Sequence, residues 1–159
     1  MLFMALLSRK VDYALLILSY LHRQEQGGCA RAIAERFHLS RAFVANILKR
    51  LCSTGYVTSQ RGIKGGYVLK KSAEEIILSE LMQALEEPFH LTECCQEIDS
   101  EHCDISELCP VKGAVIELHH KILGTLRNVT LADLVRSDAS PSVALEVSRC
   151  REATENAQS

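Results

Sequence analysis

The sequence has no Trp and only four Tyr and four Phe in 159 residues. Proteins that bind single-stranded nucleic acid stack the bases on aromatic side chains, so this scarcity argues against that class. No run of 18 apolar residues occurs, and we expect no membrane-spanning helix. Residues 1–7 are apolar but lack the basic region and the small-residue cleavage site of a secretory signal, which predicts a cytoplasmic protein.

Charge of one sign is missing from each of two adjacent parts of the chain. Residues 41–71 contain seven Lys or Arg and no Asp or Glu, whereas residues 72–111 contain eleven Asp or Glu and no Lys or Arg. The net charge of −2 hides this segregation, and the distribution of charge matters more for nucleic-acid binding than the sum. The basic part is therefore expected to touch phosphate, and the acidic part to hold a group that responds to the state of the cell.

The apolar fraction of 47% is enough to build one well-packed domain, and the patterning predicts a mainly α-helical chain. Residues 9–22 are apolar nearly all round, which indicates a buried helix. The expected parts are a winged helix-turn-helix domain with a two-stranded β wing (6–71), a linker helix and cysteine-rich loop (72–110), a long dimerisation helix with a short terminal helix (111–136), and a flexible tail (137–159).

A helix-turn-helix is predicted within residues 30–54. The first helix covers residues 30–37, Ser40 caps the second and Gly55 ends it. Four apolar residues of the second helix recur at helical spacing and should face the core: Val44, Ile47, Leu48 and Leu51. The residues expected to contact DNA are Ser40, Arg41, Ala42, Ala45, Asn46, Lys49 and Arg50. Short side chains let a helix approach the major groove, while Asn pairs with adenine and Arg with guanine.

Two strands are predicted over residues 56–59 and 67–69. The segment that joins them has three Gly in five residues, which allow positive φ angles and a tight tip. Arg61 and Lys64 lie at this tip and should enter the minor groove beside the second helix of the helix-turn-helix. A phosphate-binding loop is the alternative for a Gly-rich segment with Lys, but its Lys-Ser/Thr ending and its following helix are missing.

The acidic part opens with an amphipathic helix predicted over residues 73–87 and stopped by Pro88. After the cysteines, residues 112–128 form a long helix, followed by a short amphipathic turn over residues 130–135. The long helix carries an apolar stripe of Val111, Val115, Leu118, Ile122 and Leu126. Little chain is left to cover this stripe, so we expect it to meet its twin in a homodimer.

Seven cysteines, an odd number without a secretory signal, favour metal binding or redox sensing over structural disulfides. Cys29 and Cys52 fit as small apolar fillers, whereas Cys94, Cys103 and Cys109 lie on a polar, acidic segment. Nearby acids disfavour the thiolate form and so lower the reactivity of free thiols, whereas a bound metal centre deprotonates the thiols. The wide spacing suits an iron-sulfur cluster better than zinc, although zinc and a metal-free thiol sensor remain alternatives.

Several separated motifs together resemble the winged-helix transcription regulators that include IscR and NsrR. They are Asp12-Tyr13-Ala14-Leu15, the segment from Arg61 to Tyr67 with sequence RGIKGGY, Leu91-Thr92-Glu93-Cys94, the segment from Cys103 to Cys109 with sequence CDISELC, and the segment from Thr130 to Val135 with sequence TLADLV. The similarity runs from about residue 6 to 135, and the agreement in order and spacing is far more specific than any single motif.

The resemblance implies a dimeric DNA-binding repressor or activator whose three cysteines bind a 4Fe-4S or 2Fe-2S cluster, with loss or modification of the cluster changing the affinity for DNA. In the NsrR branch, which senses nitric oxide, an Asp of the partner's first helix is the fourth ligand, and Asp12 stands at that position. The other interpretation of Asp12 is a carboxylate that interacts favourably with the helix dipole. The IscR branch uses a His soon after the third cysteine, where this sequence has Val111-Lys112-Gly113, so the NsrR side is favoured.

The first cluster ligand is ambiguous. The Leu-x-x-Cys context selects Cys94, whereas the commoner gap of seven residues before Cys103 selects Cys95, and we expect Cys94. The rival functions are a cluster-free regulator that responds through thiol chemistry and a module that docks onto a metabolic enzyme through its acidic face. No motif brings together a nucleophile, a base and oxyanion donors, so the chain is not expected to be an enzyme.

Overall fold

The computed structural model describes residues 7–24, 27–60, 66–95 and 108–136, which form helices around one two-stranded sheet. None of the helices in these ranges is both long enough and apolar enough to cross a membrane. The helices are α1 Arg9–Arg23, α2 Ala30–Phe37, α3 Arg41–Ser53, α4 Leu78–Ala84, the 3-10 turn η1 Glu93–Cys95, α5 Lys112–Asn128 and α6 Leu131–Arg136, and the strands are β1 Val57–Gln60 and β2 Gly66–Leu69.

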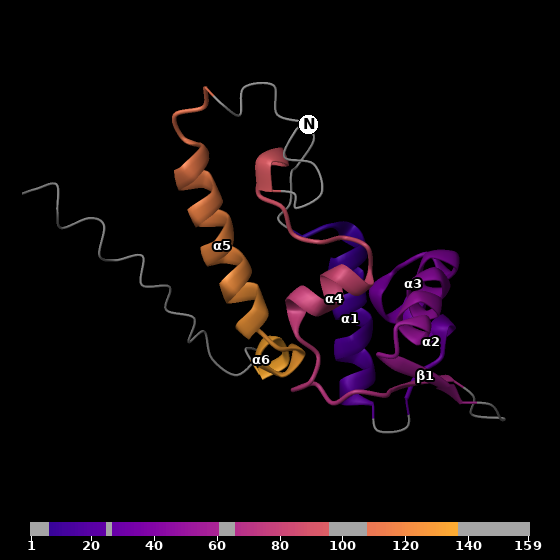
Figure 1. The fold of residues 1–159 in the computed structure, drawn as a ribbon. Coiled ribbons are helices and arrows are strands. Elements are labelled where there is room, and N and C mark those ends of the chain that lie inside the picture. Colours follow the sequence, from indigo (N-terminus) through magenta and orange to yellow (C-terminus); the bar gives the residue numbers. More distant parts are fainter. Residues whose placement is uncertain (1–6, 25–26, 61–65, 96–107, 137–159) are drawn as a thin grey trace, which may run out of the picture.

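Helices α1, α2 and α3 form the predicted helix-turn-helix body (Figure 1). The hydroxyl of Ser40 caps α3 by accepting a hydrogen bond of 3.5 Å from the amide of Phe43. Between α2 and α3, His38 takes a left-handed conformation (φ 54°), which turns the chain, and Gly55 (φ 81°) follows the end of α3. These local signals in the sequence therefore set the boundaries of α2 and α3.

The wing consists of β1 and β2, paired antiparallel with Val57 opposite Leu69. It is also tied to the turn between α1 and α2, because Gly28 and Tyr67 exchange two backbone hydrogen bonds of 2.9 Å. A Cβ atom at Gly66 would lie 2.8 Å from the carbonyl oxygen of Gly28, so glycine is needed for this close approach. The tip of the wing, with Arg61 and Lys64, lies outside the described residues.

The helix predicted over residues 73–87 is wrong in length, because α4 covers only Leu78–Ala84. Residues 73–75 form a turn, and the amide of Leu131 donates to the carbonyl of Ile76 at 2.8 Å. The amide of Leu78 donates to the carbonyl of Val129 at 2.9 Å, and Ile77, between these two hydrogen bonds, forms a β-bridge with Thr130. Pairing with the chain between α5 and α6 thus holds residues 76–77 extended, a tertiary effect that the helical pattern could not reveal.

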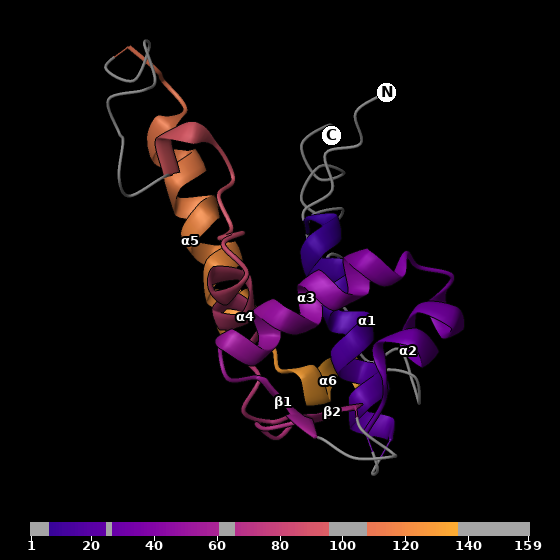
Figure 2. The same cartoon turned by 90° about the vertical axis from the view of Figure 1, so that its right-hand side faces the viewer.

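Helix α5 stands at one side of the molecule, apart from α1 to α3, in both views (Figures 1 and 2). It packs against α4 and η1, and its C-terminal end joins the hydrophobic core through Leu126. The bounds predicted for this helix are confirmed. The predicted apolar stripe is partly exposed to solvent, since Val111 and Leu118 are 56% and 48% exposed. The core itself is one cluster that runs from α1 to α6.

Candidate DNA interface and cysteine segment

The outward side of α3 has the predicted composition. Val44, Ile47, Leu48 and Leu51 are buried in the core. The exposed residues on the opposite side are Arg41, Ala42, Ala45, Asn46 and Lys49. We call these five residues the α3 face. It has cations, an amide and two short side chains, and no acid, which suits insertion into a major groove.

Arg50 is placed differently from the α3 face. Its Nε donates to the carbonyl of Ala84 at 2.8 Å, and its Nη2 lies 2.6 Å from Oε1 of Glu86. The guanidinium is thus directed at the C-terminal end of α4. The sequence analysis did not predict these contacts. Glu86 and Glu87 could have indicated them, because the macrodipole disfavours negative charge at the C-terminal end of a helix and two acids there need a cation nearby.

Helix α1 supports α3 from behind. The ring of Tyr13 meets the ring of Phe43 edge to face, with centroids 5.3 Å apart. Nine buried apolar residues of the core come from these two helices, and they pack α3 against α1. The α3 face is therefore presented by a rigid pair of helices.

At the base of the wing, Tyr56 is buried and the ammonium of Lys71 lies 4.5 Å from the centre of its ring. Burial, with the nearby carboxylate of Glu80 adding to it, raises the pKa of the Tyr56 phenol above its ordinary value. The phenol therefore stays neutral at physiological pH, and Lys71 contacts a neutral ring. This arrangement holds β1 against the chain that follows β2.

The candidate ligands of the acidic part include Cys94 and Cys95, which both lie on η1. The hydroxyl of Thr92 lies 3.1 Å from Sγ of Cys94 and 3.3 Å from Sγ of Cys95. Cys109 lies three residues before the start of α5, and all three thiols are half-buried and free of disulfides. Cys103 lies outside the described residues.

The segment that leads to η1 is anchored on α5. The ring of Phe89 stacks on the ring of His119 with centroids 5.4 Å apart and an interplanar angle of 5°. The ring of His90 is also parallel to that of His119 at 6.3 Å, and its Nδ1 lies 3.4 Å from the carbonyl oxygen of Cys95. A cavity of about 470 Å³ opens here between α4, η1 and α5. These ring contacts hold η1 beside α5 (Figure 1).

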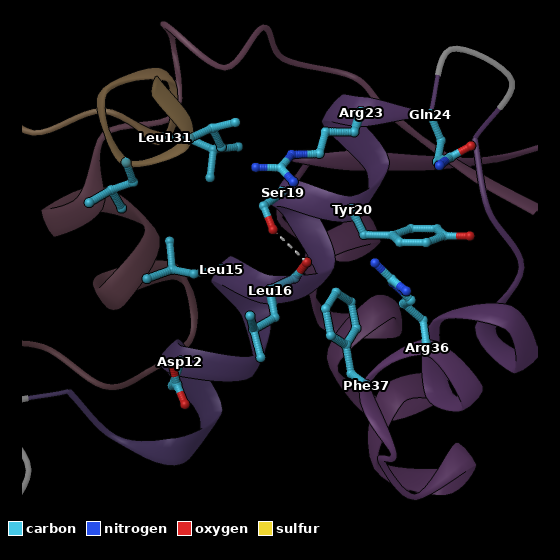
Figure 3. Close-up of a pocket in the computed structure, with 12 residues that line it drawn as sticks. Asp12, Leu15, Leu16, Ser19, Tyr20, Arg23, Gln24, Arg36, Phe37 and Leu131 are labelled. Carbon is cyan, nitrogen blue, oxygen red and sulfur yellow. Dashed lines mark hydrogen bonds between the residues drawn. The ribbon is translucent and has the colours of Figure 1, made fainter. Parts of the chain in front are cut away.

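Asp12 lies elsewhere, in the first turn of α1, and is exposed. It lines one end of a cavity of about 650 Å³ between α1, α2 and α6, together with Leu15 and Leu131 (Figure 3). Within the described ranges no three His, Cys, Asp or Glu side chains come close enough to hold a metal ion. Asp12, Cys94 and Cys109 therefore do not converge within a single chain.

The other two described cysteines have structural roles, as the sequence indicated. Sγ of Cys29 caps α2 by accepting a hydrogen bond of 3.4 Å from the amide of Ala32. Burial raises the pKa of the Cys52 thiol, which disfavours its thiolate form. Neither residue is a candidate ligand.

Comparison with known proteins gives consistent matches. Residues 7–137 match the model of the Rrf2 family, described as iron-dependent transcriptional regulators. The chain is 31% identical over 133 residues to the HTH-type transcriptional regulator NsrR of Bacillus subtilis, covering 82% of this chain and 90% of that protein. CymR, the global cysteine regulator of B. subtilis, has a similar structure, with a TM-score of 0.64 and 26% identity over 83% of this chain and 97% of that one. The structure of T. potens IscR shares the fold, with a TM-score of 0.63 and 23% identity over 83% and 87% of the two chains.

Proposed function

Because the chain belongs to the Rrf2 family of DNA-binding transcription regulators, which are not enzymes, we propose that it is a repressor controlled by an iron-sulfur cluster. The observation that carries this proposal is the pairing, in one fold, of an acid-free α3 face with free thiols on η1, which packs against α5, and just before the start of α5. The proposed signal is nitric oxide, because the NsrR of B. subtilis is a homologue and Asp12 is the non-thiolate candidate ligand.

The proposed DNA contacts start from α3. The α3 face enters the major groove, with Asn46 and Arg41 reading base edges and Lys49 contacting phosphate. Ser40 presents its cap at the helix N-terminus, and Arg61 and Lys64 of the wing reach the neighbouring minor groove. In a homodimer the two copies of α3 bind half-sites ~34 Å apart on a two-fold-related operator.

The proposed cluster ligands are Cys94, Cys103, Cys109 and, from the partner subunit, an Asp12 carboxylate. A second chain must supply the carboxylate, because Asp12 and the described thiols do not converge in one chain and Asp12 is exposed. Thiolates are the ligands that iron-sulfur clusters prefer, so the donor set fits the group. When bound, the cluster supplies a centre that nitric oxide attacks, and the oxygen-ligated iron is the labile one.

The choice between Cys94 and Cys95 is open to a direct test. Thr92 contacts both thiols at nearly equal distances, so this contact favours neither of them as the ligand. We propose Cys94 as the ligand. Cys94→Ser should then abolish the visible absorption of the cluster, whereas Cys95→Ser should retain it, and the reverse pattern would assign Cys95.

The function is tested by purifying the protein without oxygen, reconstituting it with iron and sulfide, and titrating it with nitric oxide while following absorption and operator binding. The expected result is a brown protein whose operator affinity changes as nitric oxide bleaches the cluster. Asp12→Ala should alter the spectrum and the reaction with nitric oxide, whereas Glu35→Ala, which removes an exposed acid of α2, should not. Protein that takes up neither iron nor sulfide would refute the proposal.

A second candidate is a cluster-free regulator that responds through thiol chemistry. It is favoured by the adjacent free thiols of Cys94 and Cys95, which share Thr92 as a polar contact, and by the structural similarity to CymR. Colourless, metal-free protein that binds an operator tightly and loses this affinity on oxidation would support it. Colourless protein with one zinc per chain would instead support a structural metal site, and metal-free protein captured by a metabolic enzyme would support a docking role.

A further inference from the structure

The C-terminal end of α4 is held by two other helices at once. Two consecutive acids follow α4, and each contacts a different cation. Glu86 pairs with Arg50 of α3 at 2.6 Å, and Glu87 pairs with Lys10 of α1 at 3.8 Å. The Nε of Arg50 also donates to the carbonyl of Ala84, the last residue of α4. We call these five residues the α4 junction.

The backbone of the α4 junction is a tight helix stop occupied by an unfavourable residue. The amide of Glu86 donates to the carbonyl of Gln83, and the amide of Glu87 donates to that of Met82, each at 2.9 Å. This Schellman pattern needs a left-handed residue at its centre, and Glu86 has φ 60°. Glycine takes that conformation without cost, whereas an L-residue such as Glu does not.

The macrodipole adds a second local disadvantage. Negative charge at the C-terminal end of a helix is unfavourable, yet Glu86 and Glu87 place two acids there. Arg50 and Lys10 compensate for them from other helices. Glu86 thus goes against two local preferences, for glycine at a left-handed position and for positive charge at the end of a helix. Residues that do so are found mainly at functional sites, so we look for the role of Glu86 in the groups that it contacts.

The α4 junction lies between the two sites of the proposed function. On one side, Arg50 belongs to the helix that carries Asn46 and Lys49 of the α3 face. On the other side, Pro88 and the buried Phe89 lead directly from Glu86 to η1 and its cysteines. Figure 2 shows the end of α3 reaching the region of α4. We call η1, with Cys94 and Cys95, the cysteine segment. A shift of this segment would reach Arg50, in the last turn of α3, through the short chain from Glu86 and the hydrogen bonds of Arg50.

We propose that Arg50 is a positioning residue that couples the state of the cysteine segment to the recognition helix through Glu86 and Ala84. This proposal rests on the proposed function, since it needs a cysteine segment with two states. It replaces the expectation that Arg50 contacts DNA. The forked guanidinium suits the role, because two of its N–H groups engage a backbone carbonyl and a carboxylate together, which an ammonium cannot reproduce.

The test compares operator affinity of the full-length protein in its reconstituted and cluster-free forms, prepared without oxygen, for the wild type and four variants. Arg50→Ala removes the cation. Arg50→Lys keeps the charge and loses the fork, and Glu86→Gln keeps the shape and loses the charge. Arg31→Ala is the matched control, because it breaks an exposed pair with Glu35 on α2 that does not touch α4. Thermal melting in each case confirms that the variants are folded.

For the wild type we expect the two forms to differ in operator Kd by about 5- to 150-fold, the usual range of coupling between sites. Arg50→Lys and Glu86→Gln should reduce this ratio to about twofold or less, while Arg31→Ala should leave it unchanged. The salt dependence of binding should be the same for Arg50→Ala and the wild type, because no phosphate contact is lost.

Three outcomes would overturn parts of this picture in distinguishable ways. A wild-type ratio near one refutes the proposed function and removes the basis of the coupling. A large wild-type ratio that Arg50→Lys and Glu86→Gln both retain refutes the coupling alone. A shallower salt dependence in Arg50→Ala, with the ratio retained, assigns Arg50 to the phosphate contacts instead.

Discussion

Asn46 and Lys49 lie on the same exposed side of α3, but their side chains are suited to different parts of DNA. An amide can donate to and accept from one adenine, which gives sequence discrimination. An ammonium is a point charge that attracts any phosphate. The two residues should therefore be separable by comparing specific with non-specific DNA.

Asn46→Ala should weaken binding to the operator by about 1–3 kcal/mol and leave binding to unrelated DNA nearly unchanged. Lys49→Ala should weaken both to a similar degree and reduce the slope of log affinity against log salt by about one. The measurement is a fluorescence titration of operator and scrambled duplexes at several salt concentrations. Lys121→Ala, on α5, is the control and should change neither quantity. Equal losses on both duplexes for Asn46→Ala would show that it does not read bases.

At this scale the sequence predicted the α3 face well, because helical spacing alone decides which of neighbouring residues are buried. Arg50 shows the limit of that reasoning. The sequence predicts that Arg50 contacts DNA together with Lys49, but it does not reveal the partners Ala84 and Glu86, which lie more than thirty residues further along the chain. Periodicity contains no information on such distant contacts.

The elements of the fold divide in the same way. Helix α3 begins and ends where the Ser40 cap and Gly55 place it, and α5 has the bounds predicted for it although no side-chain cap marks its start. Helix α4 is shorter than predicted because backbone pairing between residues 76–77 and the chain before α6 outweighs local helix propensity. Where a segment is decided by a partner that is distant in sequence, local patterns give the wrong boundary.

The wing depends on a close approach that one methyl group would disturb. Gly66→Ala places a Cβ atom 2.8 Å from the backbone oxygen of Gly28, so β2 must move away from the turn after α1. We expect a loss of about 1–3 kcal/mol in the free energy of unfolding, as for overpacking elsewhere. Urea denaturation measures it.

The control for this substitution is Gly113→Ala in α5, where an added Cβ atom meets nothing within 4 Å. Because alanine is a better helix former than glycine, that variant should gain up to about 1 kcal/mol. A loss in Gly113→Ala as large as that in Gly66→Ala would mean that the change at the wing is not due to the close contact with Gly28.

Helix α6 begins with a reciprocal cap that makes its stability depend on pH. The Thr130 hydroxyl donates to Oδ2 of Asp133 at 2.7 Å, its amide donates to the same oxygen at 3.0 Å, and the Asp133 amide donates back to the hydroxyl at 3.2 Å. The hydrogen bond from the Thr130 hydroxyl, and then that from its amide, lower the pKa of Asp133 below its ordinary value.

A pKa lowered in the folded state means that this carboxylate stabilises the fold above the unfolded-state pKa of about 3.9, and that the contribution is lost as pH falls below it. Asp133→Asn should therefore lower Tm at pH 7, and the difference from the wild type should shrink as the pH is taken below about 4. Differential scanning calorimetry across that range measures it. A difference in Tm that stays constant down to pH 3 would show that charge is not the cause.

For the whole molecule, the segregation of charge distinguishes a basic part that contains α3 and the wing strands from an acidic part that contains four of the seven cysteines. The candidate metal site could not be assembled in the same way. Its predicted ligands Asp12, Cys94 and Cys109 are far apart in sequence and do not converge in one chain, and the second copy that would bring them together is not encoded in any local pattern.

Exposed apolar side chains just before α5 and in its first half mark the surface that a second copy should cover. Leu108, Val111 and Leu118 are 86%, 56% and 48% exposed, and large apolar side chains exposed together mark an interface. Leu118→Glu should convert the protein to a monomer in sedimentation velocity. Its operator affinity should then fall by about 10²-fold or more, because the two half-sites are no longer bound by linked domains.

His120→Glu is the matched control for Leu118→Glu, since a residue two positions further along lies nearly opposite on the helix, and it should stay dimeric with unchanged affinity. A dimer that survives Leu118→Glu would place the interface elsewhere, and the Asp12 carboxylate would then need another route to the thiols.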